Sequence, residues 1–160
     1  MTTKETTQET KVREKKVKEK EVLEEKAPSV YFAGVGRRKT AVARVRIFEE
    51  SGEGEREITV NDRKVKVYFP TASLQSLFLE PARVVGLENR FRISVHVRGG
   101  GPAGQAAAAG LGLARAIIAF DAGHRPLLKS GKFLSRDARK VERKKPGLKK
   151  ARRAPQWSKR

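Results

Sequence analysis

The strongest constraint on the fold is a strict alternation of apolar and polar residues from Arg90 to Arg98, followed at once by a glycine-rich segment and a helical pattern. The apolar set is Phe91, Ile93, Val95 and Val97, and the polar set is Arg92, Ser94, His96 and Arg98. A period of two predicts a strand with one buried face. From Gln105 to Phe120 the period becomes that of an amphipathic helix. Because the helix and the strand each have one apolar face to bury, we expect helices to pack against one face of a sheet.

Further strands are predicted at 40–48, 57–60 and 65–69, with a turn at 51–54. Thr71 can cap a short helix that ends before Pro81. With the strand at 90–98 and the helix at 105–120, these segments make four strands and two helices. We therefore expect an α+β fold, a small four-stranded sheet with helices on one face.

The charge divides the chain into three parts. Residues 129–160 carry 14 Lys or Arg against two acids, a net of +12 out of +19 for the whole chain. This part has too few apolar residues to offset the entropy of ordering it. We expect a flexible charged extension at 1–28, a globular domain at 29–128 and an extended basic tail at 129–160, with a helical turn or two at 136–145 ended by Pro146.

A sequence pI near 10.8 with clustered charge favours a nucleic-acid partner, because cations that neutralise phosphates release counterions. The tail lacks the apolar stripe of a membrane-surface peptide. The chain has no Cys, no apolar run close to about 20 residues and no signal-like N-terminus, so a cytoplasmic protein is expected. His96 and His124 have no companions for metal binding or catalysis, so we expect no metal, no cofactor and no enzyme activity.

Gly99, Gly101 and Gly104 have the spacing of a dinucleotide-binding loop, and Asp121 lies about 20 residues downstream. The acid, however, would lie at the end of the helix instead of the next parallel strand, and the chain has no room for a doubly wound sheet. We therefore reject a cofactor site. Two readings of the glycines stay open: close packing of strand on helix, and phosphate contact at a helix N-terminus.

Four segments together are similar to the family of the ninth protein of the small ribosomal subunit. They are Gly34-Val-Gly-Arg-Arg-Lys-Thr-Ala-Val-Ala-Arg-Val-Arg46; Val60-Asn-Asp-Arg63 with Tyr68-Phe69; Gly99-Gly-Gly-Pro-Ala-Gly-Gln-Ala106 with Ala114-Arg-Ala116; and Phe133 to Gly147 with Ala151-Arg152 and Gln156-Trp-Ser-Lys-Arg160.

The resemblance implies a fold like the second domain of ribosomal protein five and a place in the head of the small subunit, in the cytoplasm. Implied partners are small-subunit ribosomal RNA, the transfer RNA of the peptidyl site and the neighbouring head proteins seven, ten and fourteen. The residues expected to contact transfer RNA are Ser158, Lys159 and Arg160.

The residues expected to contact ribosomal RNA are Arg37, Arg38, Lys39, Arg44, Arg46, Gly100, Gly101, Gln105, Arg136, Arg139, Arg143, Lys144, Lys145, Lys149, Lys150, Arg152, Arg153 and Trp157. The first three follow a Gly-x-Gly turn, which would present them on a loop. The outward arginines of the two long strands, Arg92 and Arg98 included, could equally belong to an ordinary solvated sheet face. Trp157 could stack on a base or pack against a protein.

Two other classes share some of these features. A DNA-compacting protein would have the same charge but would bind duplex DNA outside the ribosome. An enzyme acting on RNA or a nucleotide would need a pocket with a general base or a metal. Sedimentation with small subunits, nuclease activity and cofactor retention separate these classes from a ribosomal constituent.

Overall fold

The structure, a computed structural model, describes residues 30–49 and 57–158. The expected extension at 1–28, the turn at 51–54 and the last two residues lie outside this part of the chain. Contacts divide the chain into two units, Met1–Tyr31 and Phe32–Arg160. Nearly all of the described residues belong to the second unit.

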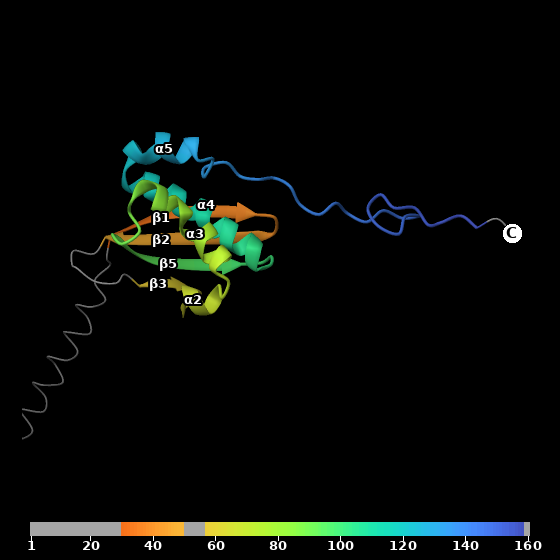
Figure 1. The fold of residues 1–160 in the computed structure, drawn as a ribbon, viewed down its shortest axis with the longest axis horizontal. Helices are drawn as coiled ribbons and strands as arrows, with labels where there is room; N and C mark the ends of the chain where they lie inside the picture. Colours follow the sequence, from red (N-terminus) through yellow and green to blue (C-terminus); the bar gives the residue numbers. More distant parts are fainter. Residues whose placement is uncertain (1–29, 50–56, 159–160) are drawn as a thin grey trace, which may run out of the picture. The chain divides into compact units, whose positions relative to one another are not determined.

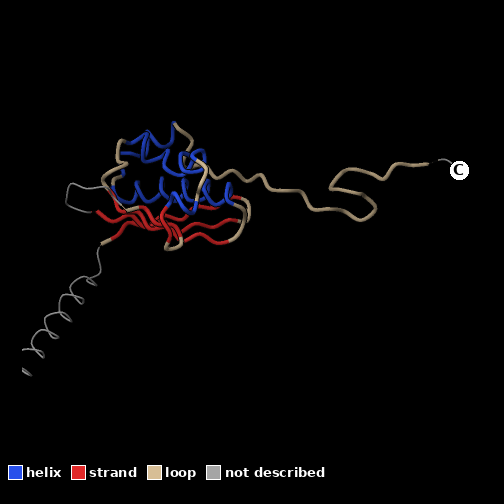
Figure 2. The backbone as a smooth tube through the Cα atoms, turned by 60° about the horizontal axis from the view of Figure 1, so that its bottom comes forward, coloured by secondary structure: helices blue, strands red, loops and turns tan. Residues whose placement is uncertain are grey.

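Five strands form one sheet, in the order β1-β2-β5-β3-β4. The strands are β1 (Tyr31–Arg38), β2 (Ala41–Glu49), β3 (Ile58–Val60), β4 (Arg63–Lys64) and β5 (Phe91–Arg98). Strands β2 and β5 pair antiparallel, whereas β3 pairs parallel with β5. The helices are α2 (Val65–Tyr68), α3 (Ala72–Val85), α4 (Pro102–Phe120), a single 3-10 turn η1 (Ala122–His124) and α5 (Arg125–Ser130). The helices lie on one side of the strands, as expected (Figures 1 and 2).

The sheet has five strands where four were predicted, and two predictions about it were wrong. The Gly-x-Gly segment lies inside β1 instead of forming a turn, and the chain reverses at Lys39 and Thr40. The expected strand at 65–69 is the one-turn helix α2, in which Val67 is 69% exposed. Five residues are too few for their period to separate a strand from a helical turn.

Helix α3 runs through Pro81 instead of ending before it. A proline inside a helix removes one hydrogen bond, the one to the carbonyl four residues earlier, and Pro81 compensates by being fully buried in the helix layer. The helix ends at Gly86, whose φ of +74° turns the chain so that the N–H of Leu87 donates to Ala82 O at 2.9 Å. Gly86 is therefore the true stop signal.

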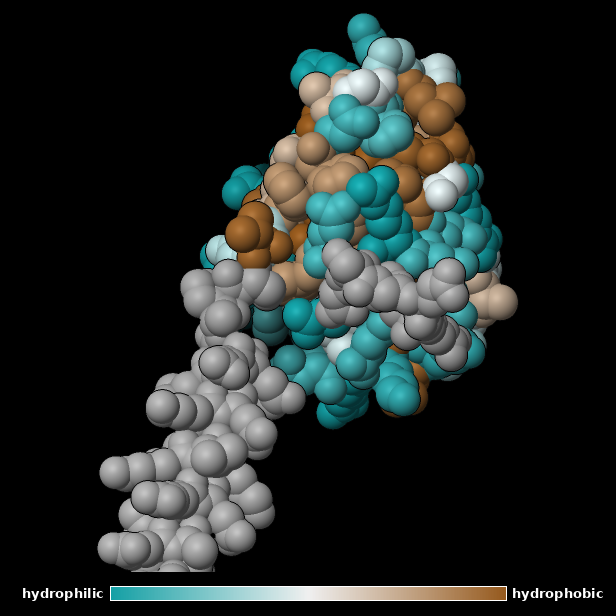
Figure 3. Space-filling view, turned by 90° about the vertical axis from the view of Figure 1, so that its left-hand side faces the viewer, coloured by the Kyte–Doolittle hydropathy of each residue, from teal (hydrophilic) through white to brown (hydrophobic). Residues whose placement is uncertain are grey.

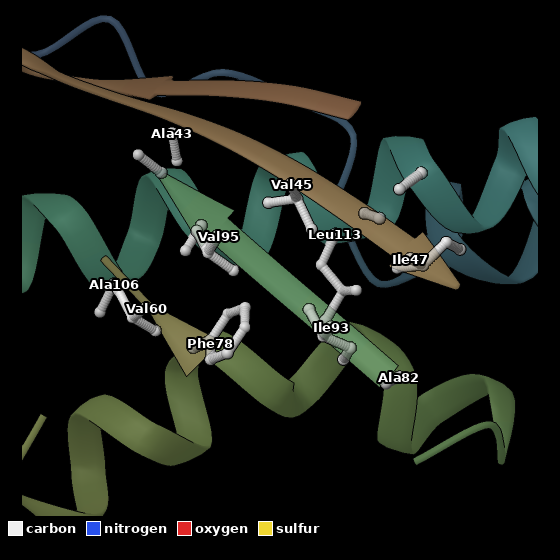
Figure 4. Close-up of a cluster of buried hydrophobic side chains, with 14 of the residues drawn as sticks. Ala43, Val45, Ile47, Val60, Phe78, Ala82, Ile93, Val95, Ala106 and Leu113 are labelled. Atoms are coloured by element: carbon white, nitrogen blue, oxygen red, sulfur yellow. The ribbon is translucent and has the colours of Figure 1, made fainter. Parts of the chain in front are cut away.

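The core lies between the sheet and helices α3 and α4. The inward residues of β2 and β5 are all buried, as their alternation predicted. Figure 4 shows Val45, Ile93 and Val95 of the sheet turned toward Phe78 of α3 and Leu113 of α4. Burying a side chain of this size contributes about 1.5 to 3 kcal/mol relative to leaving it exposed.

Glycines let β1 lie directly on α4. A Cβ on Gly36 would stand 1.9 Å from Ala108 O, and one on Gly34 would stand 2.1 Å from Gly112 O. Gly112 in turn faces β1, since its own Cβ would be 3.2 Å from Gly36 N. The strand and the helix therefore touch through their backbones, which any side chain at these positions would prevent.

Helix α4 corrects the expectation that no segment is apolar enough to span a membrane. Residues 102–120 meet that test by length and composition, and 61% of the apolar window is buried inside the protein. Its apolar residues pack against β2 and α3, so their burial in the core accounts for the composition.

Packing against the core continues past Leu128, the last residue of the expected domain. Phe133 and Leu134 are partly buried against it, and Phe133 N donates to Leu128 O at 3.1 Å. The helical turns expected at 136–145 are absent: no helix or strand is described between 131 and 158.

Candidate nucleic-acid interface

The face of the sheet opposite the helices carries the outward residues of β2 and β5. In the antiparallel register Arg44 lies opposite His96, and Val42 lies opposite Arg98. Together with Arg46, Asn61, Asp62 and Val97 these residues line a groove of about 680 Å³. The groove exists because the period of two that buries one set of side chains leaves the other set on the open face.

The groove is electropositive. It contains three arginines and one histidine against a single acid, Asp62. Arg44 and Arg98 have no ion-pair partner within 4.0 Å among residues 30–49 and 57–158. Nearby, the guanidinium of Arg92 lies over the ring of Phe48, 4.6 Å from its centroid. The side chains of Arg44 and Arg98, which have no acidic partner in the described part of the chain, suit the phosphates of a polyanion.

Figure 3 shows one end of the molecule, where hydrophobic and hydrophilic residues are mixed and the hydrophobic ones lie mainly in the upper half of the view.

Arg37, Arg38 and Lys39 do not form one cationic loop. Strand alternation points Arg37 outward, while Arg38 turns to the other side and is only 20% exposed. Lys39 follows in the turn with a φ of +52°. Arg38 makes an ion pair with Asp137, 2.7 Å between Nη2 and Oδ2. Of the three cations, Arg37 and Lys39 are the exposed ones; RNA contact by any of them stays a prediction.

The glycine loop leads into the N-terminus of α4. Gly99 and Gly100 have φ values of +72° and +68°, and Gly101 is the residue before the helix. With Lys39 and Thr40 the loop lines a small hollow of about 190 Å³. A helix start of this kind presents free backbone N–H groups beside a lysine. Both readings of the glycines have support, since a Cβ on Gly99 would also stand 2.7 Å from Thr40 O.

A side-chain network that sequence reasoning missed holds this loop. Gln105 Nε2 donates to Gly99 O at 3.2 Å, and Tyr68 donates its hydroxyl to Gln105 Oε1 at 2.9 Å. Asn61 donates to Val97 O at 3.1 Å and accepts from Val97 N–H at 2.8 Å. The sequence predicts a turn at Asn61-Asp62, and both residues have positive φ values, but nothing in the sequence indicates the hydrogen bonds of Asn61 and Tyr68. The amide of Gln105 is therefore engaged within the protein.

Asp121, the acid that completed the dinucleotide-like spacing, ends α4 instead of a strand. Its Oδ1 accepts from Gly123 N at 2.8 Å, and its Oδ2 lies 3.3 Å from His124 Nε2. These are the contacts of a helix end.

In the tail, both acids hold basic neighbours. Glu142 accepts from Lys145 Nζ at 2.7 Å and from Arg152 Nε at 2.8 Å. These hydrogen bonds, that of Lys145 first, lower the pKa of Glu142. The remaining predicted contacts of the tail are exposed: Arg136, Arg143, Lys144, Lys149, Lys150, Arg153 and Ser158, with Trp157 at 85%. Lys159 and Arg160 lie outside the described residues.

Comparison with known proteins points to one family. The family model described as ribosomal protein S9/S16 matches residues 36–160. The small ribosomal subunit protein uS9 of Corynebacterium efficiens is 52% identical over 126 residues, which cover 79% of this chain and 67% of that protein. The family match begins inside β1 and includes the open sheet face, the glycine loop and the basic tail.

Proposed function

Because the chain belongs to the ribosomal protein S9/S16 family, it is a structural constituent of the small ribosomal subunit, and we propose that it binds ribosomal RNA there and contacts transfer RNA. Its place is the ribosome, which is cytoplasmic in bacteria. The family is one of ribosomal constituents, and we propose no catalytic role for this member.

The proposed ribosomal RNA surface has two parts, the open sheet face and the tail. The observation that carries it is the groove between β2 and β5, where Arg44 and Arg98 lack acidic partners among the described residues. The exposed tail cations add a second set of phosphate contacts. Phosphate contacts of this kind position a protein on RNA without reading its sequence.

The proposed transfer-RNA contact is made by Ser158, Lys159 and Arg160, at the end of the tail. It rests on the family resemblance and on charge. Lys159 and Arg160 bring two cations, while the α-carboxylate opposes them, so the contribution to affinity should be modest and independent of base sequence. The neighbours proposed on the same basis are head proteins seven, ten and fourteen, with Trp157 stacking on a base or ribose.

The sheet face is tested with the full-length double variant Arg44→Gln/Arg98→Gln. Each lost phosphate contact makes the slope of log affinity against log salt less steep. The double variant should therefore reduce the magnitude of this slope by roughly 1.5 and weaken binding to small-subunit ribosomal RNA. Arg83→Gln/Arg90→Gln is the matched control, because it removes the same charge from residues already paired with Glu88 and Glu49. Equal losses in both double variants would mean that net charge alone matters and that the groove is not the site.

The tail end is tested separately by deleting residues 158–160. Subunits that assemble with the shortened chain should bind peptidyl-site transfer RNA more weakly while keeping their ribosomal RNA contacts. Unchanged transfer-RNA affinity and initiation fidelity would remove this part of the proposal.

A further inference from the structure

Asp137 stands out because it is an acid in a segment whose proposed role needs cations. Its Oδ2 lies 2.7 Å from Arg38 Nη2 and 2.8 Å from Arg139 Nη2, and its Oδ1 accepts from the backbone N–H of Arg139 at 2.9 Å. The carboxylate therefore joins a local turn of the tail to a strand 99 residues away in the sequence.

Arg38 also holds the backbone of the tail. Its Nη1 donates to Arg139 O at 2.7 Å and to Asp137 O at 3.2 Å. One guanidinium thus binds a carboxylate and two carbonyls at once, which the planar fork of arginine allows and the single ammonium of lysine does not.

The support on the domain side is rigid. Arg38 is the last residue of β1, whose Gly34 and Gly36 lie in backbone contact with α4. The side chain reaches a hollow of about 160 Å³ between α3, α4 and the start of the tail. Arg38 therefore projects from a strand that cannot shift without disturbing the core.

Over its described residues, the tail is attached to the domain at two places. The first is apolar: Phe133 and Leu134 pack against the core. The second is the cluster of Arg38, Asp137 and Arg139. Beyond Arg139, the hydrogen bonds and ion pairs of residues 140–158 join only residues within that range, among those that the structure describes.

We propose that Asp137 is a positioning residue that, clamped by Arg38, fixes the root of the basic tail to the end of β1 in the free protein. The tail then leaves the domain from one place before any RNA is bound, which reduces the number of conformations lost when it threads into the ribosome. This use of the clamp rests on the proposed function of the tail. The clamp itself is a property of the isolated chain.

For the removal of the charge of Asp137, the clamp predicts a change in RNA affinity opposite in sign to the change expected from net charge alone. If Asp137 were only a solvated acid, removing its charge would strengthen binding to RNA. If Asp137 holds the tail in place, removing its charge frees the tail root and weakens the contact that the tail makes.

The test uses the full-length chain. Because the chain has no Cys, two introduced cysteines are the only sites that take a spin label. One is Arg63→Cys on β4, and the other is Lys140→Cys, just past the clamp. Wild type should give one narrow distance distribution in free solution. Asp137→Asn and Arg38→Lys should both lose it, the second although it keeps the charge. Glu142→Gln is the matched control, because it removes one negative charge whose partners lie within the tail, and its distribution should stay narrow.

A narrow distribution in Asp137→Asn would overturn the proposal, and so would an equally broad one in Glu142→Gln. Thermal melting confirms that each variant folds. The distance measurement contains no RNA, whereas the transfer-RNA affinity of subunits lacking residues 158–160 tests the proposed function, so failure of one is not failure of the other.

Discussion

The backbone carbonyl oxygen of Leu77 faces Gly110 across the contact between α3 and α4, where a Cβ on Gly110 would stand 2.9 Å from it. Leu77 is four residues before Pro81, which has no N–H to donate back to that oxygen. The carbonyl freed by the proline thus meets the one residue type without a side chain. The proline in α3 and the glycine in α4 together define how closely the two helices approach.

Gly110→Ala should therefore destabilise the protein, by about 1 to 3 kcal/mol, because the added methyl meets backbone that cannot easily move. Gly104→Ala is the matched control in the same helix, since its Cβ would meet ordinary contacts at 3.7 Å and 3.8 Å. That variant should be neutral, or more stable by up to about 1 kcal/mol from helix propensity. Urea unfolding of both variants measures the difference; equal stabilities would contradict the close approach.

Gly36→Ala should be more damaging, by about 3 kcal/mol or more, because its methyl would overlap Ala108 O on α4 and force β1 away from the helix. Gly101→Ala serves as control, since a Cβ there meets nothing within 4 Å and its φ of −101° suits any residue. Thermal unfolding should separate the two variants clearly. If Gly36→Ala unfolds at the same temperature as wild type, β1 does not lie against α4 as described.

Asn61 should stabilise the folded protein for two reasons, and two substitutions can separate them. Asn61→Gly keeps the φ of +47° without strain but loses both hydrogen bonds to Val97, at about 1 kcal/mol each. Asn61→Ala loses the same bonds and adds backbone strain, so it should be less stable than Asn61→Gly. Chemical denaturation measures the order, and a reversed order would show that strain plays no part.

The Asp137 clamp should be insensitive to pH across the neutral range. Hydrogen bonds from the side chain and then the backbone of Arg139, and further the charges of Arg139 and Arg38, lower the pKa of Asp137 from its ordinary value of 3.8. A pKa lowered by folding means that the stabilisation is present above pH 3.8 and is lost as the pH falls below it. The spin-label distance should therefore stay narrow from about pH 8 to about pH 5.

Arg37, Lys132 and Glu80 line the same hollow as the clamp. Glu80→Gln controls for the other acid that lines this hollow. If the spin-label distance distribution broadens above pH 5 in both wild type and Glu80→Gln, Asp137 is not the acid that holds the tail.

The local parts of the fold were predictable from the sequence. The strands at β2 and β5 and the helix α4 have periods that run for eight residues or more, and the structure confirmed which side chains of the two strands are buried. Helix α4 formed as predicted but is buried on more of its surface than an amphipathic pattern indicates. The α+β class with helices on one face followed from these patterns. Short segments were not predictable: five residues do not separate the predicted strand at 65–69 from the helix α2, and the two glycines of β1 favour a turn over a strand.

The candidate site was predictable as a set of charges, and only partly as a set of roles. Arg44 and Arg46 lie on the open face as their alternation required. The sequence predicts RNA contact for Arg38 and Arg139, which stays a prediction, and the structure shows in addition that both hold Asp137. Nothing near Arg38 in the sequence indicates a partner 99 residues away.

The sequence by itself determined which side chains face the core, where the charge is concentrated and which family the motifs resemble, because each depends on neighbouring residues or on motif order. Only the tertiary structure decided what the glycines do and which arginines are paired. Gly36 could form a turn or a close contact, and the approach of α4 selects the contact. Arg38 could bind phosphate or carboxylate, and Asp137 at 2.7 Å makes it half of an ion pair.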